Sequence, residues 1–170
     1  MSRAEVLCDV SRCEELVNSL RGATRVKQLL ESILPSKLEI VCRPCATDGL
    51  EGNARAVLLD STPLQVVLCT NRLFEKDVEE AIIHELIHAF DYTKNRCDFS
   101  TCKGIAFSEV RAAREAECSG KYYPLQWFKT NCVRNHATRS TANVFPEQAK
   151  QCVDEVLHSA LQDKAPFLFK

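Results

Sequence analysis

Residues 82–91 read IIHELIHAFD, an apolar stretch with two histidines four residues apart and a glutamate directly after the first. Residues four apart on an α-helix lie on one face, one turn above each other. The Cβ atoms of His84 and His88 are then about 5–6 Å apart, so both imidazoles can reach one Zn²⁺ ion. The stretch therefore predicts an apolar helix with a zinc site on one face.

The glutamate between the histidines suggests chemistry at this site. Glu85 is rotated by about 100° from His84 around the helix, so its carboxylate is too far round to join the same coordination shell. It can instead contact a water molecule in the fourth position of the ion, as the general base of an H-E-x-x-H metalloprotease does. The alternative is a pair of core histidines bonded to backbone carbonyls, with a glutamate at the edge of the helix.

Catalytic zinc usually has three protein ligands and one water, so a third ligand must follow the two histidines. One candidate is Asp91, in register on the same helix; the other is Glu109 in GIAFSEVRAAREAEC, on the next predicted helix. We favour Glu109, because a loop of about ten residues lets its helix fold back against the first. Asp91 is then expected to accept a hydrogen bond from a ligand imidazole.

Other polar residues of the second half receive weaker assignments. Glu115 and Glu117 are expected to be solvated charges. His136, in CVRNHATRS, is a candidate contact to substrate or to an oxyanion, and a surface or capping role is its alternative.

Length and charge exclude several classes of protein. A chain of 170 residues with 45% hydrophobic content suits one compact domain. The 22 basic and 23 acidic residues nearly cancel, and no block of like charge predicts a nucleic-acid partner or a membrane-surface patch. No apolar run reaches the roughly 18–20 residues that span a bilayer, and the first residues resemble neither a signal peptide nor a presequence.

Ten cysteines are far more than a chain of this length ordinarily contains. The C-x-x-C pair in CRPC, residues 42–45, has no second pair nearby, which disfavours structural zinc, and no thioredoxin-like context, which disfavours redox catalysis. We therefore favour disulfide bonds, although the chain shows no secretory signal.

The pattern of apolar residues predicts an α+β fold, as a single domain over residues 1–170, and the H-E-x-x-H helix makes a zincin type the expectation. We expect an N-terminal helical segment (1–36), a small mixed sheet (37–71), zinc-binding helices (77–118) and a C-terminal helical part (122–170). Within these parts the expected helices are 11–20, 23–34, 77–92, about 105–118, 122–130 and 146–162, and the expected strands are 37–42, 54–60 and 64–70. The last two strands are expected to form a hairpin, with the edge at LQVVLCT open to an extended substrate.

Several blocks of the chain, in order, resemble a known family. VVLCTN (66–71), HELIHAFD (84–91), SEVRAA (108–113), CVRNHAT (132–138) and VDEV (153–156) are similar to the mitochondrial inner membrane metalloproteases that process and help assemble ATP synthase subunit 6. The resemblance covers about residues 37–167. It implies a zinc endopeptidase with one Zn²⁺ per chain, acting on the subunit 6 precursor and also assisting ATP synthase assembly as a chaperone.

The resemblance also implies a location in the intermembrane space, in peripheral contact with the inner membrane. Members of this family are rich in cysteine and are retained there by oxidative folding, so disulfides without a signal peptide become expected. The chain departs from the family where Tyr92, Thr93 and Lys94 replace His-Cys-Arg and where Phe107 replaces a cysteine. One pairing is therefore missing, and the candidates to replace it are Cys97, Cys102 and Cys152.

Two non-catalytic interpretations remain beside the enzyme. One is an assembly chaperone that keeps zinc as a structural element, and the other is a Ku-binding adaptor. Structural zinc sites close with four protein ligands and leave no role for Glu85, so the motif favours the peptidase.

Overall fold

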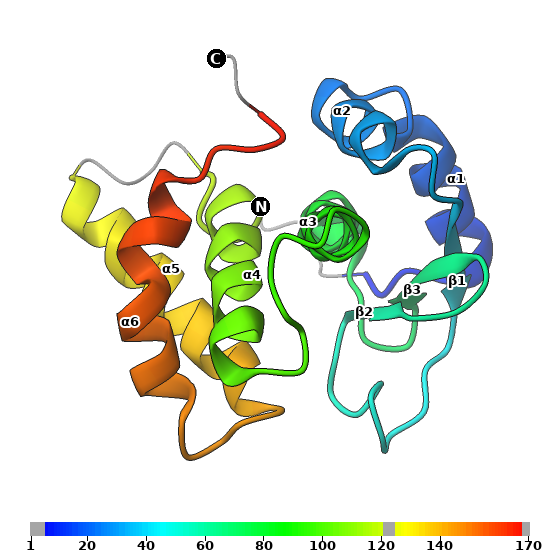
Figure 1. The fold of residues 1–170 in the computed structure, drawn as a ribbon. Coiled ribbons are helices and arrows are strands. Elements are labelled where there is room, and N and C mark those ends of the chain that lie inside the picture. The colour runs from blue at the N-terminus through cyan, green and yellow to red at the C-terminus, as the bar shows by residue number, and fades with distance from the viewer. Residues whose placement is uncertain (1–5, 121–124, 168–170) are drawn as a thin grey trace. The chain divides into compact units, whose positions relative to one another are not determined.

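The computed structural model describes residues 6–120 and 125–167, which belong to two compact units, Met1–Ala89 and Phe90–Lys170. In these residues it contains six α-helices and a three-stranded mixed sheet (Figure 1). The predicted α+β class is therefore confirmed. A single domain over residues 1–170 stays a prediction, and the two units are described separately below.

Two amphipathic helices open the first unit, close to their predicted bounds. Helix α1 (Val10–Leu20) begins where the Asp9 carboxylate accepts a hydrogen bond from the backbone N–H of Arg12 at 2.8 Å, a helix N-cap. Helix α2 (Thr24–Ile33) buries residues at the three- and four-residue spacing of one helical face: Val26, Leu29 and Ile33.

The sheet of the first unit has the strand order β1-β3-β2. Strand β1 (Leu38–Arg43) runs parallel to β3 (Leu64–Cys69), and β2 (Ala56–Leu59) runs antiparallel to β3 in the predicted hairpin. Strand β3 is therefore central, which explains its almost continuous apolar sequence. The expectation that LQVVLCT offers an open edge is wrong, because both sides of β3 are hydrogen-bonded to neighbouring strands.

Two disulfides hold the first unit together. Cys13 on α1 is bonded to Cys42 on β1, and Cys45 is bonded to Cys69 at the end of β3. The two cysteines of CRPC thus pair with distant partners rather than with each other or with a metal. The disulfide interpretation of the cysteines is confirmed here, and the structural-zinc interpretation of CRPC is not supported.

Helix α3 (Val78–Thr93) follows the short 3-10 helix Glu75–Asp77 and matches the predicted helix 77–92. Glu79 and Glu80 lie in its first turn, where acidic side chains stabilise the positive end of the helix dipole. Its apolar residues are buried on more than one side, including Ile82, Leu86 and Ile87. In the described residues, no helix is both long and apolar enough to cross a membrane.

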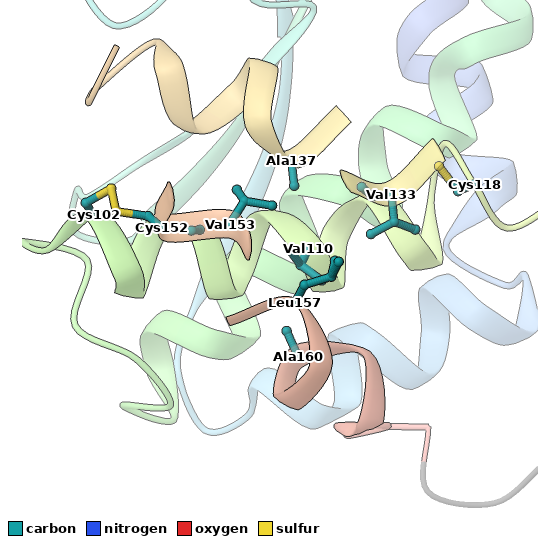
Figure 2. Close-up of a cluster of buried hydrophobic side chains, with 11 residues drawn as sticks. Cys102, Val110, Cys118, Val133, Ala137, Cys152, Val153, Leu157 and Ala160 are labelled. Atoms are coloured by element: carbon teal, nitrogen blue, oxygen red, sulfur yellow. A yellow bond between two sulfur atoms is a disulfide. The ribbon is translucent and has the colours of Figure 1, made fainter. Parts of the chain in front are cut away.

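The second unit is built from helices α4 (Cys102–Glu115), α5 (Gln126–Ala142) and α6 (Ala149–Gln162), which pack against one another. Figure 2 shows the core they share, in which small and branched side chains from all three helices meet: Val110, Val133, Ala137, Val153, Leu157 and Ala160. Close packing of such side chains is the main stabilising contribution to this unit.

Helix α5 differs most from the expectation, which was a short helix over 122–130. Residues 122–124 lie outside the described residues, and the helix runs on to Ala142. Its buried side consists of Val133, Ala137 and Thr141, four residues apart. Two of these three are small or polar, so the apolar pattern is weak, and packing against α4 and α6 decides the length of the helix.

Two more disulfides, Cys102–Cys152 and Cys118–Cys132, lie in the second unit. Cys102 begins α4 and Cys152 lies in the first turn of α6, so the first of these bonds joins two packed helices (Figure 2). Two of the three cysteines proposed to replace the missing family pairing thus bond to each other. Cys97 is a free thiol, as is the buried Cys8.

Candidate metal centre

The two motif histidines converge on one point beside α3. Their Nε2 atoms are 3.1 Å apart, and their ring centroids are 4.8 Å apart with an interplanar angle of 78°. Two nitrogen ligands of one tetrahedral Zn²⁺, each at 2.0–2.1 Å, are separated by roughly 3.3 Å. The arrangement of His84 and His88 therefore fits two ligands of a single zinc ion.

Glu85 lies on the same helix in a surrounding that a carboxylate rarely occupies. Its relative exposure is 8%, and the neighbouring Ile82, Leu86 and Ala89 are fully buried. Burying a carboxylate costs free energy, so packing alone does not explain a glutamate here. Its place beside His84 and His88 is the one that the general base of an H-E-x-x-H metalloprotease would occupy.

Asp91 belongs to the second unit, in the last turn of α3, and its carboxylate is held by α4. The Ser108 hydroxyl donates a hydrogen bond to Oδ2 at 2.9 Å, and Arg111 approaches both oxygens, with Nε 3.1 Å from Oδ2 and Nη2 3.0 Å from Oδ1. The Arg96 Nε atom lies 3.6 Å from Oδ1. A carboxylate held by a guanidinium and a hydroxyl is less available as a metal ligand, which favours the other candidate.

Glu109 is the residue after Ser108 on α4, and it is partly buried. It lies in the second unit and the two histidines lie in the first, so its role as third ligand stays a prediction. The hydrogen bond expected from a ligand imidazole to Asp91 also stays a prediction.

Arg111 is the important residue that the sequence reasoning missed. Its side chain is fully buried, and it donates to the backbone carbonyls of Asp163 at 3.1 Å and Ala165 at 2.7 Å. Its Nη1 atom also lies 2.8 Å from Oδ1 of Asp163. The one signal in the sequence was an arginine inside SEVRAA, three residues after Ser108 and therefore on the same side of the helix.

One expectation for the end of α4 is wrong. Glu115 is not a solvated charge: it is 7% exposed, and its Oε1 lies 2.8 Å from Nε of the buried Arg114. Arg114 in turn donates to the backbone carbonyls of Ala160 and Leu161 on α6. The glutamate is buried because a neighbouring arginine compensates its charge.

His136 lies on α5, one turn after Cys132. One of its ring nitrogens is within 4.8 Å of both sulfurs of the Cys118–Cys132 disulfide. Disulfide sulfurs are not thiolates, and the thiolate is the form that binds metals, so these three residues do not form a second metal site. The role of His136 in binding substrate stays a prediction.

Comparison with known proteins agrees with this geometry. The model of the Peptidase M76 family matches residues 7–168. The human protein called mitochondrial inner membrane protease ATP23 homolog is 32% identical to the chain, over 92% of this chain and 69% of that protein. The Schizosaccharomyces pombe protein called mitochondrial inner membrane protease atp23 is 29% identical, over 91% and 90%.

Coverage differs among the relatives. The zebrafish ATP23 homolog is 37% identical over 64% of this chain, and the match spans only 47% of that protein. No solved structure matches the chain significantly. The family model nevertheless covers nearly the whole sequence, and the histidine pair has the geometry of a metal site, so the chain belongs to the Peptidase M76 family, a family of proteases.

Proposed function

We propose that the chain is a zinc endopeptidase that binds one Zn²⁺ through His84, His88 and Glu109. The observation that carries this proposal is the 3.1 Å separation of the two Nε2 atoms on the H-E-x-x-H helix. Two imidazoles and one carboxylate are a donor set that suits zinc and leaves a fourth position open. The names of the relatives, which are called mitochondrial inner membrane proteases, support the same function.

The buried Glu85 is the residue to which we assign proton transfer. Zinc, when bound, supplies Lewis acidity towards water and towards a carbonyl oxygen. Glu85 accepts a proton from the water whose oxygen attacks the carbonyl carbon of the peptide bond. When the C–N bond breaks, Glu85 delivers that proton to the leaving amine nitrogen. The low exposure of Glu85 keeps this proton away from bulk water.

We place the enzyme in the mitochondrial intermembrane space, in peripheral contact with the inner membrane, with the precursor of ATP synthase subunit 6 as its substrate. The four disulfides support an oxidising compartment. The substrate and a chaperone-like role in ATP synthase assembly rest on the family resemblance. His136 is proposed as a contact to substrate or to the developing oxyanion.

The competing function is a non-catalytic assembly chaperone, or a Ku-binding adaptor, with structural zinc. A structural site closes with four protein ligands, whereas this proposal leaves one position open and gives Glu85 a task. Replacing Glu85 by Gln therefore separates the two interpretations, because the amide keeps the shape of the side chain and cannot accept the proton.

The experiment compares wild type, Glu85→Gln and a control, Glu79→Gln, which changes an exposed glutamate on the same helix. Zinc content is measured by metal analysis, and cleavage is measured on subunit 6 precursor peptides. We expect one zinc in all three proteins and a loss of cleavage of about 10²–10⁴-fold in Glu85→Gln alone. Cleavage by Glu85→Gln at the wild-type rate would overturn the mechanism.

A further inference from the structure

Apolar side chains are exposed where helix α5 begins. Leu125, Trp127 and Phe128 have relative exposures of 60%, 64% and 44%. The two aromatic rings contact each other edge to face, with centroids 4.9 Å apart and an interplanar angle of 73°. We call these three residues the α5 tip. Adjacent exposed aromatic residues are uncommon on a soluble surface and often mark an interaction site.

The α5 tip does not belong to the buried core that α4, α5 and α6 share. Helix α5 already buries Val133 and Ala137 against α4 and α6 (Figure 2). Phe128 precedes the exposed Asn135 and Arg139 by 7 and 11 residues, a spacing that places all three on the side of the helix opposite the buried one. The tip therefore faces away from the three-helix core.

The stretch of sequence that contains the α5 tip carries basic residues and no acidic ones. No aspartate or glutamate occurs between Glu117 and Glu147, whereas α5 itself carries Lys129, Arg134 and Arg139. Arg134 pairs with Asp154 on α6 at 3.1 Å. Lys129 directly follows Phe128, and the exposed Arg139 lies about three turns further along the same side of α5, in a chain whose net charge is only −1. This positive charge comes from an absence of acidic residues rather than from a run of basic ones, so no block of like charge marks it in the sequence.

We propose that the α5 tip docks at the headgroup region of an anionic phospholipid bilayer. Tryptophan and phenylalanine partition into the interface between water and acyl chains, and lysine and arginine are attracted to lipid phosphates. The positive charge distinguishes a lipid surface from a general apolar partner. The inference rests on the proposed inner-membrane function, and it names the surface that makes the contact.

The sequence itself provides the probe, because Trp127 is the only tryptophan of the chain. The disulfide-bonded, zinc-loaded chain is titrated with phosphatidylcholine vesicles that either contain or lack phosphatidylglycerol. We expect a blue shift of the tryptophan emission and protection from acrylamide with the anionic vesicles. Both changes should weaken as salt is raised, since salt screens surface charges.

Two variants keep the reporter and change its surroundings. Leu125→Ala/Phe128→Ala removes apolar contact, and Lys129→Gln/Arg139→Gln removes two charges. Each charge is worth about fivefold in affinity near an anionic surface, so the second variant should bind roughly 25-fold more weakly. The control Leu34→Ala/Leu50→Ala changes two exposed leucines of the first unit and should bind as wild type does.

Two outcomes would show that the α5 tip does not dock at a membrane. If the protein sediments with anionic vesicles while the Trp127 emission does not change, membrane contact is made elsewhere and the proposal is wrong. It is also wrong if the emission shifts with protein concentration alone, which would indicate contact with a second copy. Zinc content and cleavage of a soluble peptide are measured on the same samples, so a failure of the proposed peptidase function is recognised separately.

Discussion

Arg111 and Asp91 form an ion pair from which solvent is fully excluded. The Nη2–Oδ1 distance is 3.0 Å and the Nε–Oδ2 distance is 3.1 Å, and both side chains have zero exposure. Asp91 follows His88 by three residues on α3, and Arg111 follows Glu109 by two residues on α4. The pair thus ties the last turn of α3 to α4 within the second unit.

This burial predicts a large effect when one partner is removed. Arg111→Met leaves the Asp91 carboxylate buried without its guanidinium, and breaking a buried pair in this way costs about 3–5 kcal/mol. The control is Arg134→Met, which breaks the Arg134–Asp154 pair, whose side chains are 43% and 45% exposed. Exposed pairs contribute about 0–1 kcal/mol. Urea unfolding under oxidising conditions measures both, and equal losses would contradict the prediction.

The same contacts give a test of the third zinc ligand. Glu109→Ala removes an anionic donor, so we expect the zinc site to empty and cleavage to stop. Asp91→Asn keeps the shape of a side chain that Ser108 and Arg111 hold, and we expect zinc affinity to fall by about 10–100-fold without emptying the site. Zinc titration of both variants decides which of the two carboxylates is the third ligand. The reverse order would make Asp91 the ligand and would leave Glu109 outside the site.

Loss of either histidine predicts loss of the metal. His84→Ala and His88→Ala each leave too few ligands for tight binding. The two Nε2 atoms lie 3.1 Å apart. Both can therefore bind the same ion, and removing either one takes away a ligand. Metal analysis after dialysis against a weak chelator should find one zinc in wild type and almost none in either variant. Full occupancy in the double variant would exclude a zinc site on α3.

Local patterns in the sequence predicted the elements in which burial follows a regular period. Helix α2 is the clearest example, because its buried Val26, Leu29 and Ile33 follow the three- to four-residue spacing of one helical face. The position of β3 between β1 and β2 was not predicted, since strand order depends on contacts distant in sequence. For the same reason neither the Arg111–Asp91 pair nor the pairing of the eight disulfide-bonded cysteines followed from local spacing.

The disulfide pattern predicts a defined thiol count. Four disulfides leave Cys8 and Cys97 as thiols. A thiol reagent in denaturant without reductant should therefore find two thiols per chain, and peptide mapping should place both labels on these residues. Cys8→Ser and Cys97→Ser should each reduce the count to one. Ten thiols would indicate a reduced protein and would argue against an oxidising compartment.

Cys97 should react slowly with alkylating agents while the chain is folded. Burial, followed by the nearby Asp91 carboxylate, raises the pKa of this thiol from 9.0 to about 12, although Arg111 and Arg96 act in the opposite direction. The thiolate is the reactive form, so at pH 8 iodoacetamide should modify folded Cys97 about 10³-fold more slowly than the unfolded chain. The pKa of the Cys97 thiol is higher in the folded chain than in the unfolded one. The thiol's contribution to the free energy of unfolding is therefore complete below pH 9 and is lost as pH rises towards 12. Asp91→Asn removes a negative charge that raises the pKa of Cys97, so it should speed alkylation of the folded chain. Asp98 raises this pKa less, so Asp98→Asn should change the alkylation rate less. Equal alkylation rates in folded and unfolded wild type would show that Cys97 is exposed and that its pKa is ordinary.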